Sequence, residues 1–238
     1  LAPPKGTKSC HLLNFALGAA RQRHFCAFFT YEMVNEAMWR RMDQNISRCT
    51  RYELRQDISP LRTAFAGWRV AGAGDIWVQQ FLPKKHGCEE AVRVVERLRS
   101  EGFPIDMVVL DYLNIMTTSV SGGKRELRHE LAAIAREMSG LAKELDVLVW
   151  SATLANRQAA EKPCIKKEDI AEGYETVAVA DGIVSICGDK ILKAQQERRL
   201  FVATARDEED ERWAGRYRVD LSRMVVQEVP DEEENRNS

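Results

Sequence analysis

The chain has 238 residues, 45% of them hydrophobic and 30% charged, which is enough to bury the core of one large domain. Its 35 basic and 36 acidic side chains leave a net charge of -1, so any contact with nucleic acid must come from local patches. No apolar run reaches the length of a membrane span, no signal peptide is visible, and the six cysteines lack the spacing of a zinc site or a disulfide scaffold. We therefore expect a cytoplasmic protein with reduced cysteines and no contact with a membrane.

The first residues nearly match a phosphate-binding loop, whose pattern is G-x-x-x-x-G-K-[ST]. Lys8 and Ser9 supply the cation that reaches phosphates and the hydroxyl that holds Mg²⁺, whereas Ala2 and Thr7 replace the two glycines. If the backbone at Thr7 needs a positive φ, its β-branched side chain costs about 1–3 kcal/mol, unless Gly6 absorbs the turn. We expect a nucleotide site made of Pro4, Lys5, Gly6, Thr7, Lys8, Ser9 and Cys10.

Such a loop normally joins a strand to a helix. The sequence begins inside the motif and without a methionine. We therefore expect that the strand before Ala2 belongs to an upstream part of a longer parent protein.

After the loop, helical and strand patterns alternate along the first two thirds of the chain. Strands are expected at 25–29, 76–81, 107–110 and 147–150, and helices at 12–19, 35–46, 89–99 and 126–145, with an ambiguous polar and basic stretch at 48–74. This alternation predicts an α/β fold with a mostly parallel sheet and helices on both faces.

The last third changes character, with strand patterns joined by short turns at 182–187, 199–205, 217–221 and 224–229. They predict an antiparallel extension of the sheet. We expect one domain over residues 1–229, followed by an acidic disordered tail over 230–238.

Two carboxylates follow predicted strands. Asp111 ends the strand at 107–110, where open α/β sheets place their ligands, and next to Lys8 and Ser9 it becomes the candidate acid on the magnesium side. Glu32 follows the strand at 25–29 and is a candidate general base. The alternative for Glu32 is an ordinary acidic residue at the start of a helix.

Four segments in order resemble the motifs of DnaB-type replicative helicases. Residues 28–33 (FFTYEM) are similar to F-x-S-x-E-M, residues 109–116 to I-D-Y-L-Q-L-M, residues 144–157 to the segment ending in S-Q-L-N-R, and residues 203–207 to the late K-x-R segment. The resemblance covers nearly the whole chain. It implies a RecA-like P-loop fold and a ring, usually a hexamer, that hydrolyses ATP between subunits and moves along single-stranded DNA in a bacterial or phage-infected cell.

By this resemblance, Lys8 and Ser9 hold phosphate and Mg²⁺, Glu32 is the catalytic base, and Asp111 is the Walker B acid. Arg206 matches the arginine finger that reaches the neighbouring subunit's nucleotide. The chain departs from the family at Thr7 and in two further places: Leu154 stands at the position of the sensor glutamine, and Thr204 replaces the lysine two residues before the finger. These departures predict slow or partner-dependent hydrolysis.

The resemblance also implies DNA contacts in two loops, at 117–125 and 162–167. Our preferred contacts are Lys124 and Arg125 in the first loop and Lys166 and Lys167 in the second, which would bind backbone phosphates without sequence preference. A primase or a helicase loader is a further expected partner.

Two other functions remain open from the sequence. One is a RecA-fold recombinase or clock-type ATPase, which shares the Walker motifs, although the motif at 28–33 and the late Arg206 favour the helicase. The other is a nucleotide-binding ring subunit with weak or no hydrolysis.

Overall fold

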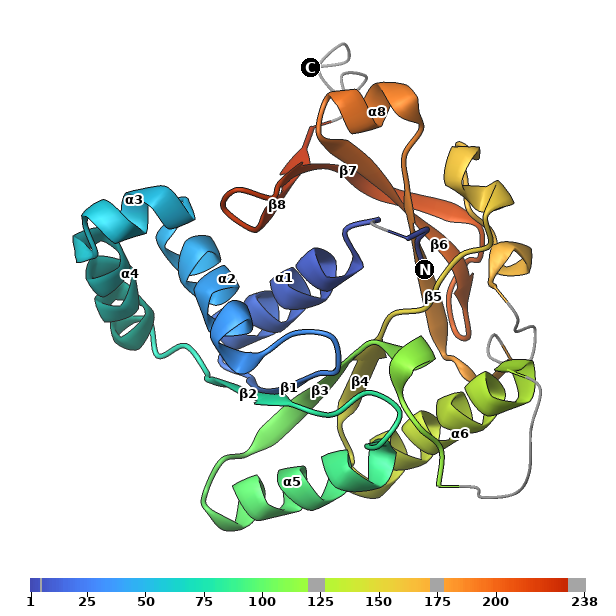
Figure 1. Cartoon of the computed structure of the whole chain (residues 1–238), viewed down its shortest axis with the longest axis horizontal. Helices are drawn as coiled ribbons and strands as arrows, with labels where there is room; N and C mark the ends of the chain where they lie inside the picture. Colours follow the sequence, from blue (N-terminus) through green and yellow to red (C-terminus); the bar gives the residue numbers. More distant parts are fainter. Residues whose placement is uncertain (5, 120–126, 172–177, 231–238) are drawn as a thin grey trace.

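In the computed structural model, the described part of the chain, residues 1–4, 6–119, 127–171 and 178–230, forms two four-stranded sheets (Figure 1). The helices are α1 (Lys8–Arg21), α2 (Asn35–Ser47), α3 (Arg51–Gln56), α4 (Ser59–Val70), α5 (Cys88–Ser100), α6 (Leu127–Leu145) and α8 (Lys190–Ala194), with 3-10 turns η1 (Leu113–Ile115), η2 (Gln158–Glu161) and η3 (Lys167–Asp169). The strands are β1 (Phe25–Thr30), β2 (Ile76–Gln80), β3 (Ile105–Asp111), β4 (Leu148–Ser151), β5 (Gly182–Cys187), β6 (Glu197–Ala205), β7 (Arg212–Asp220) and β8 (Val225–Val229).

The first sheet is parallel, with strand order β2-β1-β3-β4. Successive side chains of its central strands point to opposite faces: Phe28 of β1 packs with α1 on one face, and Phe29 packs with α5 and α6 on the other. Both faces are therefore covered, which explains why β1 and β3 read as uninterrupted apolar runs. The predicted α/β fold with a mostly parallel sheet is confirmed.

The ambiguous stretch at 48–74 contains α3 and α4. Thr50 begins α3 with a capping box, in which Glu53 N–H donates to the Thr50 hydroxyl (3.2 Å) and Thr50 N–H donates to the Glu53 carboxylate (2.6 Å). In these two helices Leu61 alone is buried. Leu61, Ala64 and Trp68 form a short apolar stripe on α4, at helical spacing, which the sequence analysis did not identify within this polar and basic stretch.

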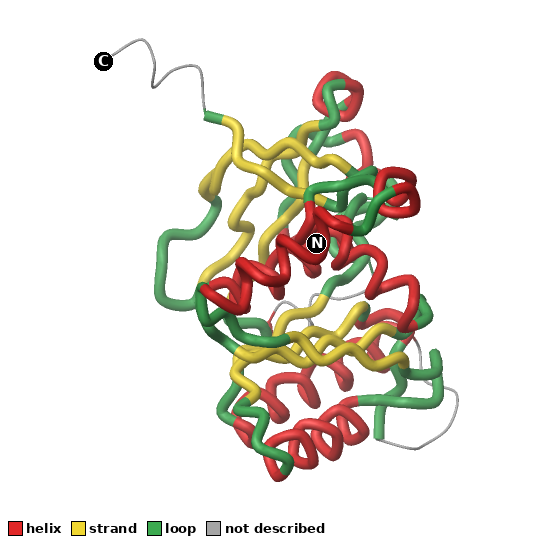
Figure 2. The backbone as a smooth tube through the Cα atoms, turned by 90° about the vertical axis from the view of Figure 1, so that its left-hand side faces the viewer, coloured by secondary structure: helices red, strands yellow, loops and turns green. Residues whose placement is uncertain are grey.

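The four strands of the last third are confirmed, but they do not extend the parallel sheet. They form a separate antiparallel sheet of order β5-β6-β7-β8. The expectation of one extended sheet is wrong for the described residues because β4 and β5 do not pair with each other. Figure 2 shows the two sets of strands with the N-terminus lying between them.

Other boundaries shift by up to five residues: β7 begins at Arg212 where residue 217 was expected, and α1 begins at Lys8 where residue 12 was expected. Helix α6 begins at Leu127, next to the segment 120–126, which lies outside the described residues, as does most of the predicted tail, 231–238. None of the described helices combines the length and the apolar character that a membrane crossing requires.

Candidate nucleotide-binding site

The loop before α1 has the backbone strain that its sequence suggested. Thr7 is the N-cap residue of α1 and has φ 65° and ψ 17°, in the left-handed region that favours glycine. Gly6 does not absorb this turn, because it is not among the glycines with positive φ. It allows a close approach instead: a Cβ atom at Gly6 would lie 2.6 Å from the carbonyl oxygen of Pro3. Lys5 lies outside the described residues.

Thr7 is held by contacts that the motif does not encode. Its hydroxyl donates to the carbonyl of Gly6 (2.6 Å) and lies 3.3 Å from Nδ1 of His11, and the same ring nitrogen lies 3.0 Å from the carbonyl oxygen of Thr7. Burial lowers the pKa of His11 to about 4, so the ring is neutral at pH 7 and donates from Nδ1 to the carbonyl. His11 was not predicted from the sequence, where its one signal is a polar residue among the residues that α1 buries.

The loop and the end of β3 are joined by Ser9 and Asp111. The Ser9 hydroxyl donates to Asp111 Oδ1 at 3.1 Å, and the Asp111 side chain is fully buried. Burial raises its pKa to about 6, against the opposing effect of the Ser9 hydrogen bond. Asp111 Oδ2 is buried and has no hydrogen-bond partner among the described residues. A buried carboxylate oxygen without a partner, beside a hydroxyl, fits a Mg²⁺ ion.

Lys8 and Glu32 lie beside this pair. Lys8 Nζ donates to the carbonyl of Pro3 (3.3 Å) and lies 5.6 Å from the centre of the Tyr112 ring. Burial lowers the pKa of Lys8, and the charges of Asp111 and Glu32 oppose that shift. Glu32 is exposed, two residues beyond β1, and its charge also raises the pKa of Asp111.

The sheet register explains this convergence. Thr30, the last residue of β1, pairs with Asp111, the last residue of β3, and Tyr31 N–H donates to the carbonyl of Asp111 (2.9 Å). Parallel strands therefore bring both predicted acids to one edge, above the N-terminus of α1, which attracts anions. Cys10 differs from the other loop residues, because its thiol is buried in the core behind the loop.

Arg206 lies on the other sheet, just after β6. Its guanidinium pairs with the carboxylate of Asp181, and its N–H donates to the Asp181 carbonyl (2.8 Å). Both side chains are exposed, at 55% for Arg206 and 77% for Asp181. This position leaves the guanidinium on the surface.

Of the predicted DNA contacts, Lys124 and Arg125 lie outside the described residues. Lys166 is exposed and pairs with Glu211 (2.7 Å), and Lys167 begins η3. The departure at Leu154 lies next to the loop: Leu154 forms a parallel bridge with Ala2, and its N–H lies 3.3 Å from Oδ1 of Asn114.

Comparisons with known proteins agree with this geometry. The DnaB-like helicase C-terminal domain family matches residues 2–212. A DnaB-like replicative helicase of Enterobacteria phage T4 is 21% identical over 212 residues, which cover 87% of this chain and 45% of the phage protein. The chain thus spans less than half the length of this relative.

Two solved structures share the fold. One is a DnaB-like replicative helicase, described together with its interactions with primase, and the other is described as an ATPase domain. Each superposes with a TM-score of 0.80 at 15% identity over 96% of this chain, covering 56% of the helicase chain and 83% of the ATPase-domain chain. The RecA-like architecture is therefore confirmed. With a family match over most of its length, the chain belongs to the DnaB-like helicase C-terminal domain family.

Proposed function

We propose that this chain is the ATP-hydrolysing motor of a replicative DNA helicase that moves along single-stranded DNA and unwinds duplex. One observation carries the proposal: in a chain of this family, Ser9 and Asp111 are hydrogen-bonded at a helix N-terminus, with Lys8 and Glu32 beside them. A cation, a hydroxyl and two acids in this arrangement suit phosphoryl transfer to water.

Each side chain has a distinct role in this proposal. Lys8 and the first N–H groups of α1 bind the phosphates of ATP, and Ser9 and Asp111 hold Mg²⁺, which neutralises phosphate charge when bound. Glu32 is exposed and next to the loop, so it can accept a proton from the attacking water. Arg206 acts on the nucleotide of a neighbouring subunit, which agrees with its position on the surface.

The proposed role of Arg206 as an arginine finger implies an oligomeric assembly. If Arg206 acts in a neighbouring subunit, the active form is a homo-oligomer, and we propose a hexameric ring. Single-stranded DNA contacts Lys124, Arg125, Lys166 and Lys167 through its phosphates. A related helicase structure is described with interactions with primase, and we propose a primase or a loader as a partner of this chain as well.

A second candidate is a ring subunit that binds ATP and hydrolyses it slowly. The left-handed φ of Thr7 favours it, since a β-branched residue in that conformation costs about 1–3 kcal/mol. Two more groups that the family places near the nucleotide are absent: Leu154 stands in place of the sensor glutamine, and Thr204 stands in place of a lysine. The two candidates differ in turnover and not in nucleotide binding.

The test measures ATP hydrolysis with and without single-stranded DNA in the full-length protein and in Lys8→Ala, Glu32→Gln and a control, Glu36→Gln. Glu36 is an exposed acid in the first turn of α2. A motor requires DNA-stimulated hydrolysis that is lost in the first two variants and kept in the control. Tight ATP binding without turnover in the unmutated protein would instead support the second candidate.

A further inference from the structure

His11 lies one helical turn after Thr7 on α1. Because side chains of a helix point back toward its N-terminus, the ring of His11 lies over the turn that begins the helix. Its backbone N–H donates to the carbonyl of Thr7 (3.1 Å), and its Nδ1 lies 3.0 Å from the same carbonyl oxygen. Two donors of one residue therefore hold a single carbonyl group, that of the left-handed residue of the loop.

The hydroxyl of Thr7 takes part in the same contact. Since the hydroxyl donates to the carbonyl of Gly6 (2.6 Å), its oxygen can accept from Nδ1 of His11, which lies 3.3 Å away. The ring is neutral, because burial lowers the pKa of His11 to about 4, and it carries its proton on Nδ1. The Nδ1–H group thus lies between the carbonyl and the hydroxyl oxygens of Thr7 and binds both.

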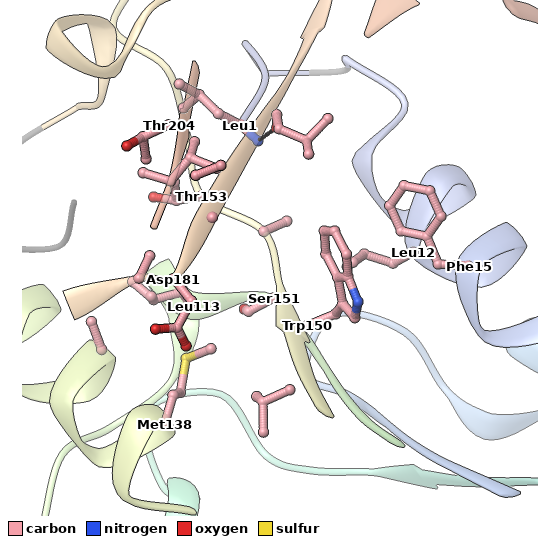
Figure 3. A pocket seen from close by; sticks show the side chains of 18 of the residues that line it. Leu1, Leu12, Phe15, Leu113, Met138, Trp150, Ser151, Thr153, Asp181 and Thr204 are labelled. Carbon is pink, nitrogen blue, oxygen red and sulfur yellow. Dashed lines mark hydrogen bonds between the residues drawn. The ribbon is translucent and has the colours of Figure 1, made fainter. Parts of the chain in front are cut away.

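The other ring nitrogen of His11 gains nothing from its surroundings. Nε2 is buried and has no hydrogen-bond partner among the described residues. His11 lines a cavity of about 480 Å³ together with two apolar residues of the same helix, Leu12 and Phe15 (Figure 3). A buried nitrogen without a partner costs free energy. The contact that favours a histidine over an apolar side chain at this position is therefore the one made by Nδ1.

We propose that His11 is a positioning residue for the phosphate-binding loop: its Nδ1–H group holds Thr7 in the left-handed conformation from which α1 presents its first N–H groups to the phosphates of ATP. This inference rests on the proposed nucleotide site. A β-branched residue disfavours the left-handed conformation, so before ATP binds the loop must be held by its own contacts. A loop that leaves this conformation for part of the time binds ATP with an affinity reduced by that fraction.

Two variants separate the hydrogen bond from the ring. His11→Phe keeps an aromatic ring beside Phe15, which lies 6.5 Å from the His11 ring between centres, and loses the Nδ1–H group. His11→Asn loses the ring but carries an amide N–H group close to the position of Nδ1. By titration calorimetry, we expect ATP affinity to fall about five- to tenfold in His11→Phe, the effect of one lost hydrogen bond, and to fall less than about twofold in His11→Asn. The reverse order would overturn the proposal, because His11 would then act through packing.

A double-mutant cycle with Thr7→Gly tests whether His11 acts through the strained residue. Glycine adopts the left-handed conformation readily and has no hydroxyl. When Thr7→Gly is present, His11→Phe should therefore reduce ATP affinity by less than about twofold. An equal loss of affinity in both backgrounds would overturn the proposal, because His11 would then act independently of Thr7.

Thermal melts without nucleotide measure the same cycle and do not depend on ATP binding. His11→Phe should lower the thermal midpoint by about 2–4 °C when Thr7 is present, and by less than half as much beside Thr7→Gly. If the unmutated chain binds no ATP, the proposed hydrolytic function is wrong, and the melts then decide whether His11 holds the loop. A smaller fall beside Thr7→Gly supports that role, and equal falls in both backgrounds overturn it.

Discussion

The hydroxyl of Ser9 donates to Asp111 Oδ1 at 3.1 Å and so joins the phosphate-binding loop to the end of β3, 102 residues away. The second oxygen of the same carboxylate is buried without a hydrogen-bond partner among the described residues. Burial makes the charged form of Asp111 costly, and a cation that reaches this second oxygen would offset the cost.

Replacing Asp111 by Asn tests this arrangement. Asn keeps the shape and an oxygen for Ser9 but removes the charge, so Mg²⁺-dependent ATP affinity should fall at least tenfold, a loss of about 1.4 kcal/mol. Because burial opposes the charged form, the thermal midpoint without Mg²⁺ should stay equal or rise. Titration calorimetry and thermal melts with and without Mg²⁺ measure both; a lower midpoint with unchanged affinity would assign Asp111 a purely structural role.

Replacing Thr7 by Gly should stabilise the protein. The left-handed φ of 65° costs a β-branched residue about 1–3 kcal/mol, and the lost hydroxyl contacts with Gly6 and His11 offset part of the gain. We expect a net gain of about 1 kcal/mol, or about 2–4 °C in the midpoint. Thr7→Ala is the control, because it removes the hydroxyl and keeps the strain. If both variants melt alike and below the unmutated chain, the hydroxyl contacts outweigh the strain.

The sequence predicted those parts of the fold whose residues are buried in a regular pattern. β1 and β3 are covered on both faces and read as apolar runs. Helices α3 and α4 expose most of their surface, and the short stripe of Leu61, Ala64 and Trp68 on α4 stands in an otherwise polar and basic stretch. The separation of the sheets depends on how the edges of β4 and β5 are paired, and no local pattern records that.

The candidate site divides in the same way. Lys8, Ser9, Glu32 and Asp111 follow from motifs, since each stands at the end of a strand or the start of a helix. The contact of His11 with Thr7 and the pair of Arg206 with Asp181 depend on side-chain directions. Spacing along the chain does not give those directions.

Arg206 tests the proposed action between subunits. Its ion pair with Asp181 is exposed and contributes at most about 1 kcal/mol, so Arg206→Ala should keep the midpoint and ATP affinity while hydrolysis falls by about 10³. Mixing Arg206→Ala with Lys8→Ala should restore part of the activity, because one variant supplies an intact loop and the other an intact finger. Arg212→Ala, which removes another exposed arginine, is the control. If the mixture of Arg206→Ala and Lys8→Ala is as inactive as each variant alone, Arg206 does not act on the nucleotide of a neighbouring subunit.

The carboxylate of Asp169 should make the stability of the fold depend on pH. Burial raises its pKa, but the Lys162 ammonium and the N–H of Lys166 outweigh burial, and the net shift is downward. A carboxyl with a lowered folded pKa stabilises the fold above its unfolded value of 3.8 and loses that contribution as pH falls through the folded value. Asp169→Asn should therefore cost about 1–3 kcal/mol at pH 7, and the cost should shrink below pH 4. Urea titrations at pH 7, 5 and 3.5 measure it, and a cost that is independent of pH would contradict the role of the charge.

Glu211 should weaken DNA binding by its pairing with Lys166. The two side chains are 2.7 Å apart and exposed, and the hydrogen bond and charge of Glu211 raise the pKa of Lys166. Glu211→Gln frees the ammonium for a phosphate, so affinity for single-stranded DNA should rise and the slope of log affinity against log salt should steepen by about 0.7. Lys166→Ala added to Glu211→Gln should reverse this change in slope, because the freed ammonium is then absent.

The control for this pair is Glu89→Gln on α5, which removes another exposed acid paired with an arginine, Arg93; the side chain of Glu89 is 65% exposed and that of Glu211 is 40% exposed. Fluorescence anisotropy with a labelled oligonucleotide at several salt concentrations measures all three variants. Any gain from Glu211→Gln that arises only from the change in net charge should appear equally in Glu89→Gln. If the affinity for single-stranded DNA rises in Glu211→Gln only, and the rise disappears when Lys166→Ala is added, the phosphate contact belongs to Lys166. Glu211 then acts through this one lysine.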